Sequence, residues 1–232
     1  MTDEQPKEEI LINVTPREVR AALLENGILQ EVYIERDTRR GLISNIYKGR
    51  VSRVLPGMQA AFVDIGLERT AFLHASDIAK KVLPDGDQAM QSAPDIRELV
   101  REGAEVLVQV VKDPLGNKGA RLSTFITLPS RFLVLLPSGS GVGVSSRIDE
   151  DAERDRLRSL LEELQGDSPG YGIIARTAAE GASRESLQAD LEFLQKLWSS
   201  VQEQARRSKA RCLVHEDLQL PDNPLASATS PD

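Results

Sequence analysis

The chain has 232 residues, which is enough for one large or two small domains with their own cores. Its net charge of −7 argues weakly against nucleic acid, and no apolar run approaches the roughly 20 residues that span a bilayer. A single cysteine, Cys212, excludes an intramolecular disulfide framework and a multi-cysteine zinc site within the chain, and we expect it to be a small buried residue. The acidic, polar start has no signal-peptide core, so we expect a cytoplasmic protein without a membrane segment.

The first 40 residues predict two or three antiparallel strands. Apolar-rich runs at residues 10–14, 19–24 and 28–34 are separated by Thr15-Pro16 and by the tight-turn pair Asn26-Gly27. An isolated small sheet is marginal in water. We therefore expect these strands to belong to a larger sheet that is completed elsewhere in the sequence.

The region from about residue 44 to residue 128 predicts a small antiparallel barrel of the OB type. A short helical turn at residues 96–101 and a flexible loop at residues 85–95 are expected before its fourth strand. Such a barrel exposes a sheet face where bases stack on aromatic rings while cations follow the phosphates. The five expected strands lie at residues 46–54, 59–65, 70–73, 105–111 and 120–128.

The first three of these strands carry both rings and cations. Phe62 and Phe72 stand among small or β-branched neighbours, and three cations, Lys48, Arg50 and Arg53, lie on a strand otherwise rich in Ile, Tyr and Val. Residues 36–53 contain six cations and one acid, so the acidic chain has a locally basic stretch. Each ring could instead belong to the core, and the cations could form an ordinary solvated face. The combination of rings and cations favours a nucleic-acid-binding barrel.

Beyond residue 129 the pattern changes to alternating strands and helices. Strands are expected at residues 131–136, at 144–148 with Arg147 on the strand, and at 171–175. Leucines at helical spacing predict one helix at residues 151–164 and another that Ser183 opens and that runs to about residue 207. We interpret the apolar stripe of the second helix as core; the alternative is a surface for a partner helix. The last residues, 221–232, have the composition of a disordered tail.

Six segments of the chain follow one another in a characteristic order. They are INVTP (residues 12–16), GILQEVYIER (27–36), NIYKGRVSRVLPGMQAAFVDIG (45–66), AFLHASDI (71–78), VQVVKDPLGNKGARLSTFITLPSR (108–131) and IIARTAAEG (173–181). Together they resemble the ribonuclease G / ribonuclease E family, and its ribonuclease G branch most. The similarity covers roughly residues 10–220.

The resemblance implies an α+β chain in which a five-stranded OB-type RNA-binding barrel, residues 41–128, is inserted in a partial RNase H-like sheet. Residues 1–40 would form the first part of that RNase H-like subdomain. Residues 129–208 would form an α/β region that senses the 5′-monophosphate end of RNA. Residues 209–220 would start the return to the RNase H-like sheet, and residues 221–232 would be an atypical tail.

The resemblance also implies an activity and a set of RNA contacts. The family comprises Mg²⁺-dependent endoribonucleases that cleave single-stranded, A/U-rich RNA in rRNA processing and mRNA decay, and that act as oligomers. Its barrel contacts fall on Phe62, Phe72 and Lys118 of this chain. We expect Lys48 and Arg50 to add phosphate contacts to that set.

The 5′-phosphate contacts of the family fall on Arg176 and Thr177. An Arg fork with a hydroxyl suits a terminal phosphate because the contacts are charge-assisted. The alternative for Arg176 is a surface ion pair. Further contacts of the family fall at Val134 and at Ser130, where relatives often have Gly, and Arg147 lies nearby in a Ser-Arg pair where Arg-Arg is expected.

The catalytic part of the family pattern is not found in this sequence. The Mg²⁺-binding carboxylates and the zinc-linking cysteines belong to a later domain, and residues from Asp222 onward match nothing in it. We therefore expect no Mg²⁺ site and no zinc link in this chain. The candidates Asp64, Asp113, His74 and His215 have no partner at metal-ligand or nucleophile spacing.

Two functional hypotheses follow from these expectations. In the first, the chain is the RNA-binding portion of a ribonuclease G-like endoribonuclease and does not cleave RNA alone. In the second, it is a stand-alone, non-catalytic RNA-binding or interaction module. Under either hypothesis, the expected partners of the chain are single-stranded RNA with a 5′-monophosphate end and a second copy or a full-length relative.

Overall fold

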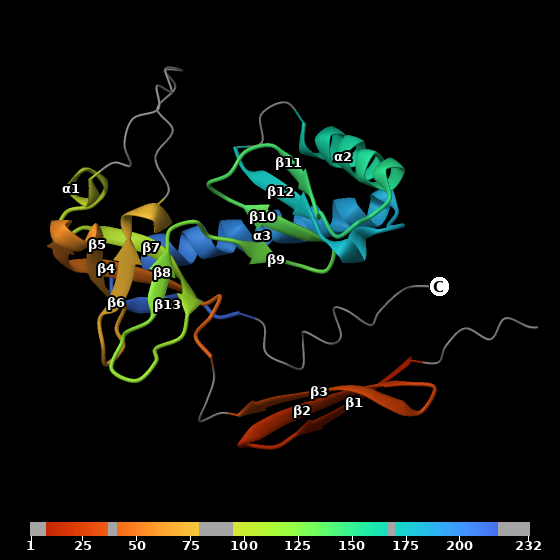
Figure 1. Ribbon diagram of the computed structural model, residues 1–232, viewed down its shortest axis with the longest axis horizontal. Coiled ribbons are helices and arrows are strands. Elements are labelled where there is room, and N and C mark those ends of the chain that lie inside the picture. The colour runs from red at the N-terminus through yellow and green to blue at the C-terminus, as the bar shows by residue number, and fades with distance from the viewer. Residues whose placement is uncertain (1–7, 37–40, 79–94, 167–169, 218–232) are drawn as a thin grey trace, which may run out of the picture. The chain divides into compact units, whose positions relative to one another are not determined.

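The computed structural model describes residues 8–36, 41–78, 95–166 and 170–217 (Figure 1). They form two compact units, which divide between residues 41 and 42, with residue 217 grouped with the first. The expectations for residues 85–94 and 221–232 lie outside the described ranges. No helix within those ranges is long and apolar enough to cross a membrane.

The first unit is a three-stranded antiparallel sheet in the order β1-β2-β3. Its strands are β1 (Glu8–Val14), β2 (Glu18–Glu25) and β3 (Ile28–Arg36). The predicted turn at Asn26-Gly27 is confirmed: both residues have positive φ, 51° and 78°, as a two-residue hairpin turn requires. The assignment of this sheet to an RNase H-like subdomain stays a prediction.

The second unit contains the predicted barrel. Its five strands are β4 (Ile46–Leu55), β5 (Ala60–Asp64), β6 (Ala71–His74), β7 (Glu105–Lys112) and β8 (Arg121–Ser123), and β4 pairs with β7 to close it. The β6–β8 pair is parallel, whereas the other pairs within the barrel are antiparallel. The OB-type barrel is therefore confirmed as closed and mixed, and not as wholly antiparallel.

The barrel core follows from alternation along the strands. Val63 of β5 and Leu73 of β6 are fully buried, as are Val108 of β7 and Leu122 of β8. Short elements connect the strands at the ends of the barrel: two 3₁₀ turns, η2 (Pro56–Met58) and η3 (Ala75–Asp77), and a one-turn helix, α1 (Ile96–Leu99).

The predicted single strand at residues 120–128 is wrong. It is divided into β8 and a two-residue strand, β9 (Leu128–Pro129). The chain turns between them because the Thr124 amide donates to the Asp77 carbonyl at 2.8 Å and the Thr127 amide donates to Oε1 of Gln109 at 2.9 Å. These bonds replace the ladder bonds that a continuous strand would need.

A second sheet, in the order β11-β12-β10-β9, follows the barrel. β10 (Leu133–Leu136) and β12 (Gly172–Ala175) lie at its centre, and two helices, α2 (Asp151–Gln165) and α3 (Arg184–Arg207), pack leucines against it in one core. Ser183 caps α3 as predicted, through a bond from the Ser186 amide to its hydroxyl at 3.2 Å. A 3₁₀ turn, η4 (Thr177–Ala179), follows β12.

The predicted strand at residues 144–148 is misplaced. The strand of this region is β11 (Val142–Val144), which pairs with β12 in parallel. A turn follows it, closed by the Ile148 amide on the Ser145 carbonyl at 3.2 Å. Arg147 therefore lies in an exposed turn and not on a strand.

A last strand, β13 (Cys212–His215), joins the chain back to the barrel by pairing with β4. The close approach requires a glycine: Gly66 has φ +87°, and a Cβ there would lie 2.3 Å from the Arg211 carbonyl oxygen. Asp64 and Arg211 form an ion pair of 2.7 Å beside it. Cys212 is half-buried here, so the expectation that it is a buried residue is wrong; its thiol lies 2.9 Å from the Lys209 carbonyl oxygen.

Candidate nucleic-acid interface

Two phenylalanine rings lie on the outer face of the barrel. Phe62 of β5 and Phe72 of β6 are directly opposite each other, with ring centroids 6.3 Å apart and planes at 68°. Both alternate with fully buried neighbours, such as Val63 and Leu73, and are themselves half-buried. Because successive strand residues point to opposite faces, both rings point outward. The alternative that they belong to the barrel core does not hold.

Two β-bulges place cations in the same row as these rings. In β4, Val51 pairs with Val63 but Arg53 pairs with Phe62, so Ser52 is the extra residue. Without the bulge, Arg53 would share the inner face with Val51. A bulge turns the following side chain to the other face, so Arg53 lies next to Phe62.

The second bulge is in β7. Val110 pairs with Leu122, and after the extra residue Val111 the next pair is Lys112 with Arg121. Arg121 is itself opposite Phe72. A continuous outer row therefore crosses the barrel, with the two rings at its centre and cations on both sides: Arg53, Phe62, Phe72, Arg121 and Lys112. We call these five residues the outer row.

Lys48 and Arg50, the two cations predicted to contact RNA, differ from Arg53 in their surroundings. Nζ of Lys48 lies 3.1 Å from Glu105 and 2.9 Å from the Ser208 carbonyl oxygen, and the side chain is only 19% exposed. Arg50 is 54% exposed and lies 3.3 Å from the same carboxylate. The hydrogen bond from Lys48, more than that from Arg50, lowers the pKa of Glu105, which keeps this carboxylate charged. Both predicted cations are thus engaged in ion pairs, whereas Arg53 has no side-chain partner among the described residues.

Lys118 lies in the loop between β7 and β8, close to the start of β6. The following residue, Gly119, packs against Thr70 so closely that a Cβ would lie 2.0 Å from the Thr70 carbonyl oxygen. Phe72 then donates its amide to the Ala120 carbonyl at 2.8 Å. The loop therefore holds Lys118 near the strand that carries Phe72, and its side chain has no partner among the described residues.

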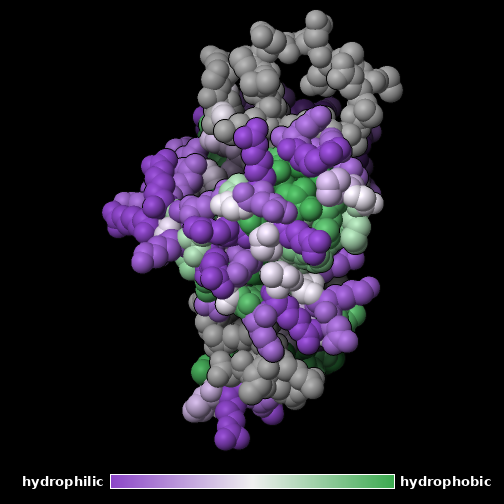
Figure 2. Space-filling model, turned by 90° about the vertical axis from the view of Figure 1, so that its left-hand side faces the viewer, coloured by the Kyte–Doolittle hydropathy of each residue, from purple (hydrophilic) through white to green (hydrophobic). Residues whose placement is uncertain are grey.

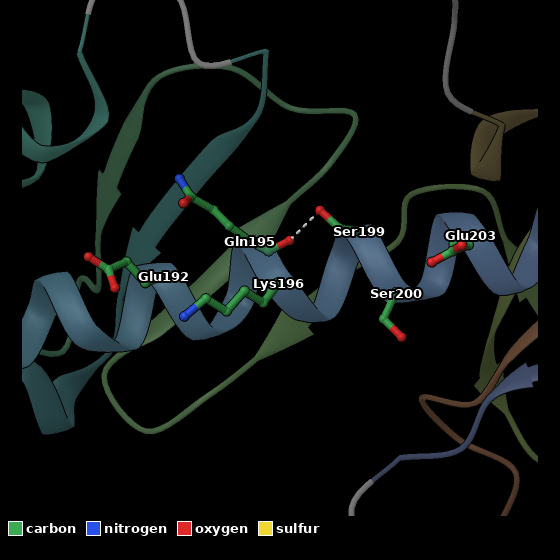
Figure 3. A pocket seen from close by; sticks show the side chains of 6 residues that line it. All are labelled: Glu192, Gln195, Lys196, Ser199, Ser200 and Glu203. Atoms are coloured by element: carbon green, nitrogen blue, oxygen red, sulfur yellow. Dashed lines mark hydrogen bonds between the residues drawn. The ribbon is translucent and has the colours of Figure 1, made fainter.

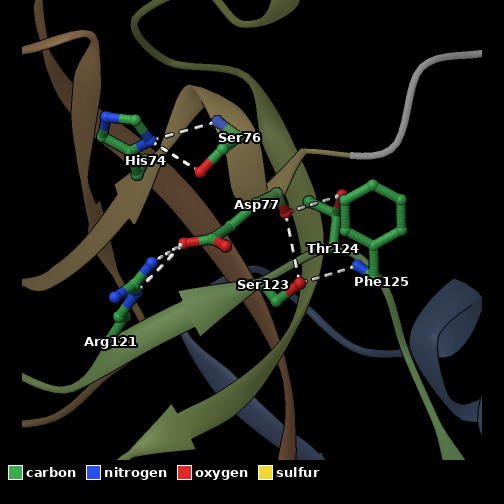
Figure 4. Close-up of polar contacts among 7 residues, drawn as sticks. All are labelled: His74, Ser76, Asp77, Arg121, Ser123, Thr124 and Phe125. Atoms are coloured by element: carbon green, nitrogen blue, oxygen red, sulfur yellow. Dashed lines mark hydrogen bonds and ion pairs between the residues drawn. The ribbon is translucent and has the colours of Figure 1, made fainter.

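A network of polar contacts fixes the end of β6 and the chain after β8 (Figure 4). Nε and a terminal nitrogen of Arg121 donate to one oxygen of Asp77 at 3.0 and 2.9 Å. The Asp77 carbonyl accepts from the hydroxyl of Ser123 at 3.2 Å. Nδ1 of His74 accepts the Ser76 amide at 3.1 Å, so in neutral His74 the proton lies on Nε2. Because the ring of His74 lies 6.4 Å from that of Phe72, it extends the aromatic surface along β6.

The second candidate site lies at one edge of the other sheet. β11 and β12 are parallel and β10 is antiparallel to them, so the ends of the first two and the start of the third share an edge. This arrangement brings together Arg147, Arg176 and Thr177, which are all exposed, with the turn that contains Ser130. Val134 lies one residue inside this edge, opposite Ile174, and is half-buried.

Arg176 is held by the turn between β9 and β10. Its backbone amide donates to the Phe132 carbonyl at 2.8 Å, and its guanidinium donates to the Ser130 carbonyl. The guanidinium makes no ion pair within the described ranges, and the role of Arg176 in phosphate binding stays a prediction. Its remaining N–H groups can form a fork for an anion.

Within the described residues, other features add no further candidate site. In the described part of the chain, no three His, Cys, Asp or Glu side chains are grouped as metal ligands would be. A hollow of about 490 Å³ lies along α3, and Figure 3 shows the six polar side chains of that helix that line it. None of the predicted site residues lines this hollow. Figure 2 shows the barrel side as mainly hydrophilic, with a small hydrophobic area between polar side chains.

Sequence reasoning found the rings but missed three members of this surface. Lys112 gains its position from the bulge in β7, Arg121 from the parallel pairing of β8 with β6, and Asp77 from the turn after β6. A bulge leaves only a weak trace in sequence, namely a cation that falls out of step with the alternation of apolar residues. That signal is present at Arg53, two residues after the buried Val51.

Comparison with known proteins agrees with this geometry. Residues 43–125 match the S1 RNA binding domain, and residues 127–232 match the Ribonuclease E/G family. The chain is similar to Ribonuclease G of Escherichia coli K12 and of Haemophilus influenzae, with 53% identity to each over 91% and 92% of this chain. It is 42% identical to Ribonuclease E of Haemophilus influenzae over 90% of this chain.

The chain spans less than half the length of these relatives. It covers 43% of each Ribonuclease G sequence and 22% of the Ribonuclease E sequence. A solved multidomain protein with nucleic acid binding domains from Streptococcus pneumoniae aligns over 81% of this chain and 53% of its own, at 13% identity and a TM-score of 0.25. That score is too low to indicate a shared overall arrangement.

Proposed function

Because this chain belongs to the ribonuclease E/G family, we propose that it is the RNA-binding portion of a ribonuclease G-like endoribonuclease. It binds single-stranded RNA on its barrel and the 5′-monophosphate end at the edge of its second sheet. The observation that carries the proposal is the outer-face pair of rings, Phe62 and Phe72, between the cations Arg53 and Arg121.

The outer row suits a flexible, unpaired strand. Each ring offers a surface for one base, and stacking of this kind is worth roughly 1–3 kcal/mol per base and tolerates any base. Arg53 and Lys118 have no side-chain partners among the described residues, so neither must break an ion pair to reach a phosphate. Lys48 and Arg50 share Glu105, and their contribution to RNA binding is expected to be smaller.

The 5′ end is proposed to bind beside Arg176. Its guanidinium, steadied by the Ser130 carbonyl, can donate to a terminal phosphate together with the hydroxyl of Thr177. Arg147, exposed at the same edge, adds a second positive charge. The backbone at Ser130 and Val134 completes the proposed site, as the family resemblance implies.

Hydrolysis is proposed as an activity of the longer relatives. Mg²⁺ would activate water and stabilise the charge that develops on the phosphate. No group of metal ligands occurs among the described residues, so we propose that the ligands lie in the part of the relatives that this chain does not match. Roles in rRNA processing and mRNA decay, and assembly with a second copy or a longer relative, belong to the same proposal.

A binding assay with a fluorescent A/U-rich oligonucleotide tests this function. We expect the chain to bind the 5′-monophosphorylated form more tightly than the 5′-hydroxyl form, and to leave both intact in the presence of Mg²⁺. Equal affinity for single-stranded RNA and for a duplex of the same sequence would contradict the stacking proposal. Cleavage that a chelator abolishes would show that the chain carries its own catalytic groups.

A further inference from the structure

Asp190 of α3 makes an unusual set of contacts for a helix side chain. A single carboxylate oxygen, Oδ2, accepts three hydrogen bonds: from the Ser130 hydroxyl at 2.6 Å, the Leu133 amide at 2.9 Å and the Phe132 amide at 3.0 Å. All three donors belong to the turn between β9 and β10. The side chain of one helix residue therefore holds the tip of a hairpin that is 57 to 60 residues away in sequence.

The same turn holds Arg176 from its other side. The turn is closed by the Ser130 amide on the Leu133 carbonyl at 2.8 Å. Two of its carbonyl oxygens then accept from Arg176: that of Phe132 from the backbone amide, and that of Ser130 from the guanidinium. A continuous series of hydrogen bonds thus leads from Asp190 through the turn to Arg176, with no direct contact between the two charged side chains.

Asp190 satisfies backbone donors that have little access to water, since Leu133 is fully buried and Phe132 is half-buried. That role alone does not explain why all three bonds converge on the turn that also holds Arg176. An acid near a phosphate site is also unfavourable, because like charges repel. The compensating gain is geometric: charge-assisted bonds are short and strong, and three of them on one oxygen restrict the turn more than water would.

We propose that Asp190 is a positioning residue for the 5′-phosphate site. It does not touch the RNA; it fixes the Ser130 and Phe132 carbonyls so that the Arg176 guanidinium is already oriented when a 5′-monophosphate arrives. Preorganisation of this kind raises affinity by reducing the ordering cost of binding. The inference rests on the proposed function of the Arg176 edge and adds a residue that contacts it only indirectly.

The test compares affinities for 5′-monophosphate and 5′-hydroxyl forms of one oligonucleotide. For Asp190→Ala we expect the preference for the monophosphate to fall by roughly tenfold, as the loss of charge-assisted bonds suggests. The affinity for the 5′-hydroxyl form, which depends on the barrel, should stay unchanged. Asp190→Asn, which keeps one acceptor oxygen of the same shape, should lose less, and Ser130→Ala, which removes one of the three bonds, should lose least.

Glu192→Ala is the matched control. It removes the same charge from the same helix two residues further along, at an exposed position where, among the described residues, the carboxylate accepts a hydrogen bond from Gln188. Its preference should equal that of the unaltered chain. If the control loses the preference to the same extent, the effect is one of net charge and the positioning inference is wrong.

The remaining outcomes separate this inference from the proposed function. If the unaltered chain shows no preference for the monophosphate, both are overturned. If Arg176→Gln abolishes the preference while Asp190→Ala and Asp190→Asn retain it, the 5′-phosphate site stands and the role of Asp190 is wrong. Should Asp190→Ala not fold, the Asp190→Asn and Ser130→Ala variants carry the same comparison, and an unchanged preference in both contradicts the inference.

Discussion

Phe62 and Phe72 lie opposite each other on the outer face of the barrel, where we propose that RNA binds. Two rings of this size would normally be placed in a core. Here the alternation of β5 and β6 assigns the inner positions to Ala61, Val63 and Leu73, and the rings remain outside. The two adjacent, half-exposed rings leave aromatic surface on which bases could stack, and this favours the proposed binding role.

Replacing Phe62 by alanine should therefore weaken RNA binding without unfolding the barrel. We expect a loss of roughly 1–3 kcal/mol in binding free energy, measured by fluorescence anisotropy, because one stacking surface is removed. Phe193→Ala is the control, since Phe193 is an exposed ring (50%) on α3. A large drop in the melting temperature of Phe62→Ala would instead indicate a structural ring.

The two arginines of β4 predict different salt dependences. Arg53 is unpaired among the described residues, whereas Arg50 shares Glu105 with Lys48. For Arg53→Gln we expect the slope of log affinity against log salt to become less steep by about 0.7, the value for one phosphate contact on a single strand. Arg50→Gln should change the slope less. Equal changes for both variants would argue against the assignment of Arg53 to the interface.

At the scale of elements, the sequence predicts regular features well and irregular ones poorly. The hairpin at Asn26-Gly27, the helix capped by Ser183 and the barrel strands β4 to β7 follow from turn residues and periodicity. The strand expected at residues 120–128 fails because Asp77 and Gln109 take its backbone donors, and both are distant in sequence. Contacts of that kind cannot be read from local pattern.

The candidate interface likewise contains some residues that the sequence predicts and others that it does not. Periodicity identifies the rings, because they lie at outer positions of short strands. It cannot identify Lys112, because the bulge at Val111 changes which face this residue occupies. It cannot place Arg121 beside Phe72 either, because the parallel pairing of β8 with β6 joins segments that are distant in sequence. Nor does it show that Glu105 engages Lys48 and Arg50, since this acid lies more than 50 residues away.

The contact between Glu153 of α2 and the turn before α3 predicts that the stability of the protein depends on pH. Glu153 accepts two bonds of 2.6 Å from Arg156 and one of 2.9 Å from the Gly181 amide, and these bonds, those from Arg156 first, lower its pKa to about 2. A carboxylate with a lowered folded-state pKa stabilises the protein above its ordinary pKa of about 4.3, and this stabilisation is lost as pH falls towards 2.

Glu153→Gln should therefore lower the free energy of unfolding at pH 7 by about 1–3 kcal/mol. The difference from the unaltered chain should shrink as the pH is lowered from about 4.5 to about 2, as urea titrations at several pH values would measure. Glu162→Gln on the same helix is the control, because that exposed side chain has no partner among the described residues. A difference that is constant with pH would contradict the assigned ion pair.

The junction of β13 with the barrel gives a second prediction at this scale. Gly66→Ala places a Cβ against the Arg211 carbonyl in a backbone conformation that L residues rarely adopt. We expect β13 to separate from β4, with faster amide exchange at residues 212–215 and a lower melting temperature. Gly57→Ala is the control, since a Cβ at Gly57 meets no atom within 4 Å and its φ is not positive. Unchanged exchange at β13 would mean that the backbone adapts without cost.

At the scale of the second unit, one helix connects the two proposed RNA sites. α3 holds the Arg176 edge through Asp190, and its C-cap, Ser208, accepts a hydrogen bond from Lys48 of the barrel at 2.9 Å. Ile46 of β4 is part of the same core as the leucines of α3. The barrel and the second sheet are therefore joined by contacts of α3 with β4, in addition to following each other along the chain. These contacts explain why the two form one compact unit.

The most direct measurement of the central claim is the affinity of the chain for a 5′-monophosphorylated, single-stranded A/U-rich oligonucleotide across a range of salt concentrations, with the Phe62→Ala, Phe72→Ala double variant beside it. We predict salt-dependent binding with a slope of about −2 to −4, and a large loss of affinity in the double variant with an unchanged circular dichroism spectrum. Binding that is independent of salt and unaffected by loss of both rings would contradict the claim that the outer row grips RNA.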